Sequence, residues 1–189
     1  MKNNYIYPME KAARRLLPKN DRLEIVKESM YRVNIIESGI LYFYLYDQTD
    51  EQPYIADIYT KGDCVSNILP ESNILENGYF RAKTDCTFLS FSLMDVTNDR
   101  KMFMRTSETI IQHYIKNCKL VHCKNIREKL LFYFNSYYSP VKGKKFTVDI
   151  SYTDIAEYLG TDRASVMREI KKMSQDGIIS VEKKNITLL

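Results

Sequence analysis

The chain has 189 residues, 44% hydrophobic content and a net charge of +4, enough for one large or two small folded domains. It contains no long uncharged apolar run and no apolar signal-peptide core, so the sequence predicts neither a transmembrane helix nor export. The four scattered cysteines do not form a secreted disulfide framework, so we expect a reduced, cytoplasmic protein. Abundant Lys, Asn, Ile and Tyr are compatible with an AT-rich bacterial genome.

The N-terminal half has mainly strand-like patterning. Glu10–Leu17 is a helix-like segment that matches no specific motif. From about Tyr31 to Phe91, β-branched and aromatic runs alternate with turn signals, which predicts an antiparallel sandwich or barrel. The predicted strands are Val33–Ile36, Ile40–Tyr46, Tyr54–Tyr59, Tyr79–Lys83 and Thr87–Phe91.

A long helical run is predicted from about Asp99 to Tyr137. It contains five residues at the 4-3-4-3 spacing that is typical of a coiled-coil seam. The spacing extends over only about two heptads, so by itself it also fits an amphipathic helix packed on its own domain. These residues, called the seam below, are Ser107, Ile111, Tyr114, Cys118 and Val121.

Both histidines and two of the four cysteines also lie in this run. Cys118 and His122 are four residues apart and share a helix face, so two such pairs across a dimer would offer four soft metal ligands. The simpler interpretation is a small apolar seam residue beside a solvated histidine. We therefore predict no metal and no cofactor, and we expect Cys64 and Cys86 to be core residues.

Residues Ser151–Leu189 have the pattern of two short helices around a glycine, followed by a β-hairpin. Ser151 with Asp154 has the form of a capping box with a shorter acid. Gly160 suits the positive φ of a tight turn, and Asp162 is a good N-cap for the second helix. The expected buried faces are Ile155, Ala156 and Leu159 on the first helix and Val166, Ile170 and Met173 on the second.

The exposed face of the second helix carries basic residues. In a helix-turn-helix, the N-terminal part of this helix enters the major groove, where an arginine can bind guanine through two hydrogen bonds. Gly177 would end the helix, and a turn at Glu182–Asn185 would join two strands. Basic and acidic residues are equal in number over Ser151–Leu189, so the net charge of the segment does not favour DNA binding. The position of the basic residues on one face of the helix does. The candidate contacts are Thr161, Arg163, Ala164, Ser165, Arg168, Lys171 and Lys172, with Lys183 and Lys184 at the hairpin tip reaching phosphate.

The C-terminal segment resembles the DNA-binding domain of the Crp/Fnr superfamily of bacterial transcription regulators. The matching stretches are Asp154–Gly160, Arg163–Arg168 and Asp176–Ile179. The resemblance implies that the two arginines read bases. Family members usually carry a glutamate after the first arginine, where this chain has Ala164. Because a methyl group cannot accept a hydrogen bond from cytosine, we expect an operator that differs from the family's commonest one.

The middle of the chain resembles the cyclic-nucleotide-binding β-roll of the same superfamily, so the resemblance covers roughly residues 31–189. Its landmarks are the Glu37–Gly39 turn, the pair Gly62 and Asp63, and the strand Phe80–Thr84, which includes Arg81. The roll is expected to be shortened at its start. The implied class is α+β: a jelly-roll-like β-roll effector domain at 1–98, a dimerisation helix at 99–124 and a winged helix-turn-helix at 125–189.

The phosphate cassette of this roll departs from the family pattern. Members that bind a cyclic nucleotide use a glycine-glutamate pair, whose glutamate holds the ribose, and an arginine-serine pair, whose arginine neutralises the phosphate. Aligned here, the first pair falls on Ser66 and Asn67 and the second near Glu76 and Asn77. A carboxylate in place of the arginine would repel the phosphate, so we expect neither cyclic AMP nor cyclic GMP to bind.

The predicted function is a sequence-specific, homodimeric transcription regulator on a palindromic operator, with RNA polymerase as a further partner and an unknown effector. The alternative is a small-molecule or metal/redox-sensing β-roll module with weak or no specific DNA binding. The sequence contains no His-Glu-x-x-His run, phosphate-binding loop or nucleophile elbow, so we expect no enzyme activity.

Overall fold

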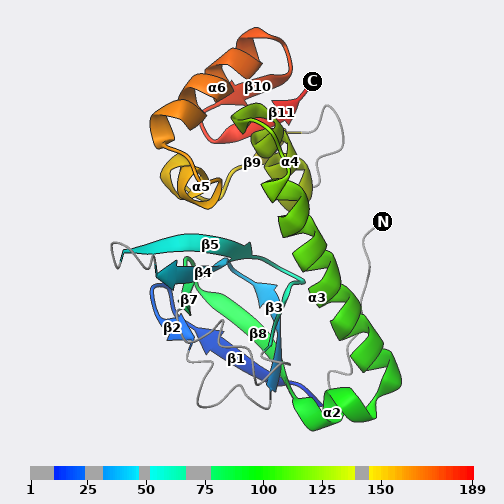
Figure 1. Ribbon diagram of the computed structural model, residues 1–189. Coiled ribbons are helices and arrows are strands. Elements are labelled where there is room, and N and C mark those ends of the chain that lie inside the picture. The colour runs from blue at the N-terminus through cyan, green and yellow to red at the C-terminus, as the bar shows by residue number, and fades with distance from the viewer. Residues whose placement is uncertain (1–10, 24–31, 47–51, 67–77, 139–144) are drawn as a thin grey trace. The chain divides into compact units, whose positions relative to one another are not determined.

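The computed structural model describes residues 11–23, 32–46, 52–66, 78–138 and 145–189. The chain divides into two compact units, Met1–Tyr114 and Ile115–Leu189 (Figure 1). The boundary lies inside a long helix, α3 (Arg100–Val121), so each unit contains part of that helix. It also falls within the segment 99–124 in which the sequence predicts the dimerisation helix.

The first unit is built from two antiparallel four-stranded sheets. Strand pairing is antiparallel throughout, as expected for a roll assembled from short strands. Each predicted strand between Tyr31 and Phe91 is present. The first sheet has the order β1 (Ala13–Leu17), β8 (Cys86–Ser92), β3 (Arg32–Ser38) and β6 (Cys64–Ser66), and the second β2 (Arg22–Leu23), β7 (Gly78–Ala82), β4 (Leu41–Tyr46) and β5 (Pro53–Tyr59).

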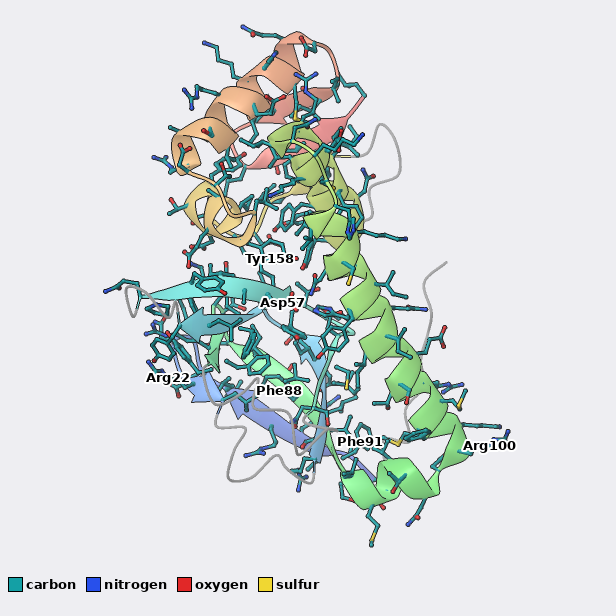
Figure 2. All side chains as sticks on the ribbon, viewed as in Figure 1. Arg22, Asp57, Phe88, Phe91, Arg100 and Tyr158 are labelled. Carbon is teal, nitrogen blue, oxygen red and sulfur yellow. The ribbon has the colours of Figure 1, made fainter. Side chains whose placement is uncertain are left out.

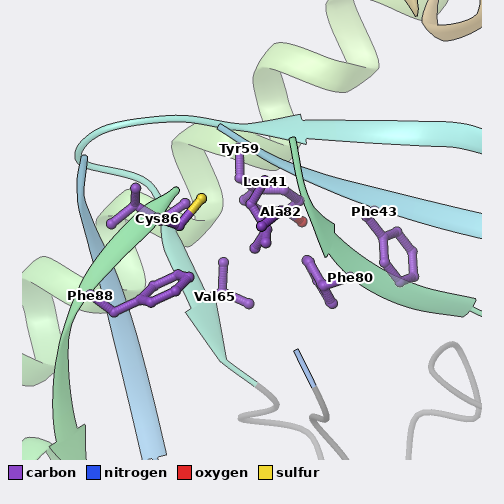
Figure 3. Close-up of a cluster of buried hydrophobic side chains, with 9 residues drawn as sticks. Leu41, Phe43, Tyr59, Val65, Phe80, Ala82, Cys86 and Phe88 are labelled. Carbon is purple, nitrogen blue, oxygen red and sulfur yellow. The ribbon is translucent and has the colours of Figure 1, made fainter. Parts of the chain in front are cut away.

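A buried hydrophobic cluster fills the space between the two sheets (Figure 3). Alternate residues of β4 and β7 point into it, which is the period-2 pattern of strands with one buried face. Ring contacts extend across the cluster: the centroids of Phe43 and Phe80 lie 4.7 Å apart. The unit is therefore a β-sandwich of the predicted roll type. The members of the cluster are Ile36, Leu41, Phe43, Tyr59, Val65, Phe80, Ala82, Cys86 and Phe88.

The helical expectation for Glu10–Leu17 is wrong. Residues Ala13–Leu17 form β1, which pairs with β8 from Ala13 opposite Ser90 to Leu17 opposite Cys86. Alanine, arginine and leucine favour a helix locally, but the ladder of hydrogen bonds to β8 outweighs that weak preference. The roll therefore includes β1 and β2 and is not shortened at residue 31.

The predicted helical run Asp99–Tyr137 is two helices rather than one. Helix α3 ends at Val121, and α4 (Ile126–Tyr138) begins after a short break. Asn125 starts the second helix, since its side-chain oxygen accepts a hydrogen bond from the Glu128 amide at 2.9 Å. A short helix, α2 (Leu93–Asn98), precedes α3 and is capped by Ser92, which accepts from the Asp95 amide at 3.0 Å.

A buried histidine attaches α3 to the roll of the first unit. The Nε2 atom of His113 lies 2.8 Å from Asp57 Oδ2, and its Nδ1 atom lies 3.3 Å from Asp63 Oδ1. Its ring stacks on Tyr59 with centroids 4.3 Å apart. Burial raises the pKa of the Tyr59 phenol, and the nearby Asp57 carboxylate raises it further. Because both ring nitrogens face carboxylate oxygens, only a protonated imidazole can donate to both. Asp57 is labelled in Figure 2.

In its described residues, the second unit combines the end of α3 and three further helices with a small antiparallel sheet. Its aromatic centre includes Tyr133 and Phe134, both almost fully buried. The strand of residues 145–147 was not predicted from the sequence. Within the part of the chain that the structure describes, no helix has the length and apolar character needed to cross a bilayer. The elements after α4 are β9 (Lys145–Thr147), α5 (Tyr152–Tyr158), α6 (Arg163–Gln175), β10 (Ile179–Glu182) and β11 (Asn185–Leu188), with sheet order β10-β11-β9.

Candidate nucleic-acid interface

The two helices α5 and α6 are joined as the sequence predicts. Ser151 Oγ accepts a hydrogen bond from the Asp154 amide at 3.1 Å, and Asp162 Oδ1 accepts one from the Ser165 amide at 2.8 Å. Both residues therefore satisfy amides that the first turn of a helix leaves without partners. Between the helices Gly160 has a φ of +64°, a left-handed conformation that an L side chain rarely adopts. The helix-turn-helix geometry is confirmed.

The apolar faces of α5 and α6 are buried against the rest of the second unit. Each of the six predicted positions is at most 4% exposed, so the helical period was assigned correctly. This packing fixes the rotation of α6 about its own axis and determines which residues remain outside. The six are Ile155, Ala156, Leu159, Val166, Ile170 and Met173.

The candidate base-reading residues lie together on the outer face of α6. Arg163, Ala164 and Arg168 are exposed, and Ser165 is half-buried. Lysines continue this basic face along the helix. No acidic side chain interrupts the run from Arg163 to Arg168, whose exposed residues are the two arginines, Ala164 and Met167. Lys171 and Lys172 are exposed, and Thr161 in the turn before the helix is half-buried.

A chain of hydrogen bonds follows this face from the helix start. Ser165 Oγ donates to Asp162 Oδ2 at 2.6 Å, and Arg168 Nη2 donates to Ser165 Oγ at 2.8 Å. The bonds from the Ser165 hydroxyl and the Ser165 amide lower the pKa of Asp162. The three residues therefore form a connected polar row rather than separate surface groups. The sequence places them at i, i+3 and i+6, which is consistent with contact along a helix.

An ionic clamp holds α6 against α4. Arg127 Nε lies 2.5 Å from Glu169 Oε1, and Arg127 Nη2 lies 2.7 Å from Asp176 Oδ2. These two carboxylates raise the pKa of the Arg127 guanidinium. Lys129 Nζ also donates to the Leu159 carbonyl oxygen at 2.8 Å, at the end of α5. Sequence reasoning missed these contacts, because the partners lie 30 to 49 residues apart along the chain and no motif links them.

The hairpin after α6, with β9 added at its edge, is the wing. Glu182 pairs with Asn185, so Lys183 and Lys184 alone form the turn, and both side chains are exposed. Lys183 has a φ of +58°, as the first residue of such a tight turn requires. The Val148 amide donates to the Lys184 carbonyl oxygen at 2.8 Å and ties the tip to the chain beside β9. Lys145 pairs with Glu182 and lowers its pKa. Both lysines that are predicted to contact phosphate therefore lie at the tip of this hairpin.

The seam lies on a largely exposed face of α3. Ile111, Tyr114 and Val121 are 56%, 59% and 78% exposed, and Cys118 is exposed as well. Ser107 is half-buried. Met104 and Ile115 lie beside the seam and are 60% and 48% exposed, so the exposed apolar face is wider than the seam itself. Apolar side chains in this number on one helix face mark a surface that favours contact with another protein.

The described residues of the cassette region make bonds within the roll. Gly62 has a φ of +94°, and Asp63 Oδ2 accepts from the Thr60 amide at 2.7 Å. Ser66 Oγ donates to the Arg32 carbonyl oxygen at 3.2 Å, and Arg81 Nε donates to the Asn20 carbonyl oxygen at 3.0 Å. These contacts support the sandwich itself. The predicted cassette positions Asn67, Glu76 and Asn77 lie outside the described residues.

The four cysteines differ in how far they are buried. Cys64 and Cys86 are buried in the roll, as predicted, and burial raises the pKa of both thiols. Cys118 is exposed, and Cys123 is half-buried with its thiol directed to the Lys119 carbonyl oxygen at 3.5 Å. Across residues 11–23, 32–46, 52–66, 78–138 and 145–189, no group of three or more His, Cys, Asp or Glu side chains is arranged to hold a metal ion.

Comparisons with known proteins agree with this geometry. Residues 128–189 match the family model of the Crp-like helix-turn-helix domain. No curated protein sequence matches the chain. Solved structures align over nearly its whole length at low sequence identity, so they establish the fold.

The similar structures include FixK2 from Bradyrhizobium japonicum, with 18% identity, a TM-score of 0.70 and coverage of 94% of this chain and 92% of that one. A cyclic nucleotide-binding domain containing protein from Listeria monocytogenes has 9% identity and a TM-score of 0.72, covering 96% and 92% of the two chains. The transcriptional regulator TTHA1359 of the CRP/FNR family from Thermus thermophilus has 14% identity and a TM-score of 0.64, covering 94% and 93%. Residues 128–189, the C-terminal third of the chain, therefore form a Crp-like helix-turn-helix domain, and the chain as a whole has the fold of FixK2 and TTHA1359.

Proposed function

We propose that this protein is a transcription regulator that binds a specific duplex DNA site through α6. The observation that carries the proposal is the outer face of this helix, where Arg163 and Arg168 project from a firmly capped N-terminus. Such a helix end fits the major groove, and arginine there discriminates guanine by two hydrogen bonds. The match of residues 128–189 to the Crp-like helix-turn-helix domain supports it.

Different residues of this surface have different roles in the proposed complex. Arg163 and Arg168 read bases, while Ala164 contacts a thymine methyl group. Lysines and the backbone hold phosphates, which fixes the register of the protein without reading sequence. The phosphate contacts are Lys171 and Lys172 on α6, Lys183 and Lys184 on the wing, and the Thr161 region before the helix.

The active form is a homodimer joined through the seam. The exposed face of α3 is apolar and follows heptad spacing, and such a face pairs most simply with its own copy in a parallel two-stranded arrangement. A two-fold axis along the seam would present two α6 helices to one side of DNA. The half-sites would then be separated by about 34 Å, one turn of the duplex, and the operator would be palindromic.

The effector of the roll is not a cyclic nucleotide in this proposal. The aligned cassette lacks the arginine and the glutamate that would hold phosphate and ribose. The retained landmark residue Asp63 is engaged with Thr60 and His113. An effector of another kind would act only through different affinities for two arrangements of the dimer. We place the protein in the bacterial cytoplasm, with RNA polymerase as a further partner and with the functional segments 1–98, 99–124 and 125–189.

Selection from a pool of random duplexes tests this function. The purified full-length protein should enrich a palindrome, and the enriched duplex should show a discrete shift in a gel at salt near physiological. The enriched half-site should contain guanine at one or more positions, because two arginines read it. Recovery of no common sequence over several rounds would reject specific DNA binding and leave the sensory module as the remaining function.

A further inference from the structure

The hydroxyl of Ser165 is engaged on both sides. Its oxygen lies 2.6 Å from Asp162 Oδ2 and 2.8 Å from Arg168 Nη2. A carboxylate can only accept and a guanidinium can only donate, so the direction of both bonds follows from chemistry. The single hydroxyl proton points to Asp162, and a lone pair of the same oxygen receives Arg168.

The row of hydrogen-bonded side chains from Asp162 to Arg168 begins at the N-terminus of α6. Asp162 caps the helix by accepting from the Ser165 amide at 2.8 Å through its other carboxylate oxygen. The carboxylate is therefore fixed by the backbone while it orients the hydroxyl. Its lowered pKa keeps it charged and accepting at neutral pH. The position of the Arg168 guanidinium is in this way linked to the backbone through two side-chain bonds.

We propose that Ser165 is a positioning residue that pre-orients Arg168 for base recognition, rather than a base contact of its own. The inference rests on the proposed DNA-binding function and deepens it. A bond at one guanidinium nitrogen leaves N–H groups of the same side chain to bind guanine. A side chain already restricted to one orientation loses less conformational entropy when it binds, so the contact to its base pair becomes stronger and more selective.

A double-mutant cycle on the selected operator separates positioning from direct contact. Ser165→Ala should weaken binding by about 5-fold and reduce discrimination at the base pair that Arg168→Ala identifies, since the two groups are in contact. In the Arg168→Ala background, Ser165→Ala should change affinity by less than about 2-fold. Ser165→Thr keeps a hydroxyl and should restore both affinity and discrimination.

Ser174→Ala is the matched control, because Ser174 is an exposed serine on the same helix beyond the arginines. Ser174→Ala should change neither the affinity for the operator nor the discrimination at the base pair that Arg168 reads. Ser165→Ala keeps the amide that Asp162 caps, so α6 should remain folded. An equal loss of affinity from Ser165→Ala with and without Arg168 would show a direct DNA contact and overturn the inference.

A measurement without DNA tests the same row independently of the proposed function. The ¹⁵Nε order parameter of Arg168 should fall toward the flexible range, below about 0.6, when Ser165 becomes alanine, and should stay high in Ser174→Ala. An order parameter that Ser165→Ala leaves unchanged overturns positioning, whether or not any duplex is selected. If the order parameter falls as expected but no duplex is selected, the DNA-binding function is rejected and the positioning role of Ser165 stands.

Discussion

Ala164 is the smallest side chain among the exposed residues of the first turns of α6. Its neighbours Arg163 and Arg168 are long and cationic, so the methyl group is flanked by groups that reach further into a groove. Whatever base Ala164 faces is therefore read by shape or by methyl contact and not by a hydrogen bond. In the proposed complex, this single position distinguishes the base-reading surface from one that carries a glutamate there.

Ala164→Glu should change the operator that the protein selects. A carboxylate at this exposed site can accept from a cytosine amino group, so the enriched half-site should gain a C·G pair at one position. Sequencing of the selected pools from both proteins measures the change. Ala164→Gln is the control of similar size without the charge. An unchanged consensus would mean that residue 164 does not face a base.

Lys183→Ala should weaken DNA binding evenly across sequences. The residue lies at the wing tip, where contact with phosphate carries no sequence information. Titrations at several salt concentrations should show the slope of log affinity against log salt reduced by about 1. Lys145→Ala, which removes a lysine paired with Glu182 on the same sheet, should leave the slope nearly unchanged. A loss confined to one operator would assign Lys183 to base reading instead.

At the scale of secondary-structure elements, local signals explain which predictions succeeded. The caps at Ser151 and Asp162, the glycine at 160 and the apolar period of α6 are all encoded within a few residues. The structure confirms each of them. Strand β1 depends instead on β8, far along the chain, and its own residues favour a helix. Non-local pairing of this kind leaves no mark in the local sequence, so this strand could not be predicted.

The contacts of the candidate site likewise include some that local sequence predicts and some that it does not. The exposed positions of Arg163 and Arg168 follow from helical periodicity once the buried stripe is known. An exposed hydroxyl at Ser165 fits both a base contact and a bridge to a neighbour, so sequence alone could not distinguish them. The Arg127 clamp and the His113 cluster join residues 42 to 56 positions apart, and a lone histidine or arginine gives no indication of such partners.

His113→Gln should destabilise the roll through its attachment to α3. Removing the imidazole breaks its hydrogen bonds with two nearby carboxylates, one of them buried, a loss of about 1–3 kcal/mol for a buried polar group whose partner is removed. Urea unfolding followed by tyrosine fluorescence should show an earlier first transition. His122→Gln, which alters the exposed histidine directly after α3, should change the free energy of unfolding by less than about 0.5 kcal/mol. Equal midpoints for the two variants would show that the cluster contributes no net stability.

At the scale of the whole molecule, the apolar face of α3 carries the proposed dimer interface. Ile111→Lys should convert the dimer to a monomer, because two lysines would face each other across the seam in place of apolar contacts. Sedimentation velocity should show the halved mass, and affinity for the full palindrome should fall to that for a half-site. The Met94→Lys protein, in which an even more exposed apolar residue on α2 is changed, should remain dimeric. A dimeric Ile111→Lys protein would place the interface elsewhere.

The division of the chain inside α3 has a consequence for how its parts can be separated. Most proteins of two units can be cut in a connecting loop, but here the cut after Tyr114 would split a continuous helix. A fragment that begins at Ile115 would start with a helix stub of seven residues whose first amides have no capping partner. So short a stub frays in water, and Tyr158, whose hydroxyl donates to Asn117 at 3.1 Å, would lose its support. The second unit is therefore not an exchangeable module with clean ends, and chimaeras with structurally similar regulators should be joined before Arg100 or after Val121 to keep this helix intact.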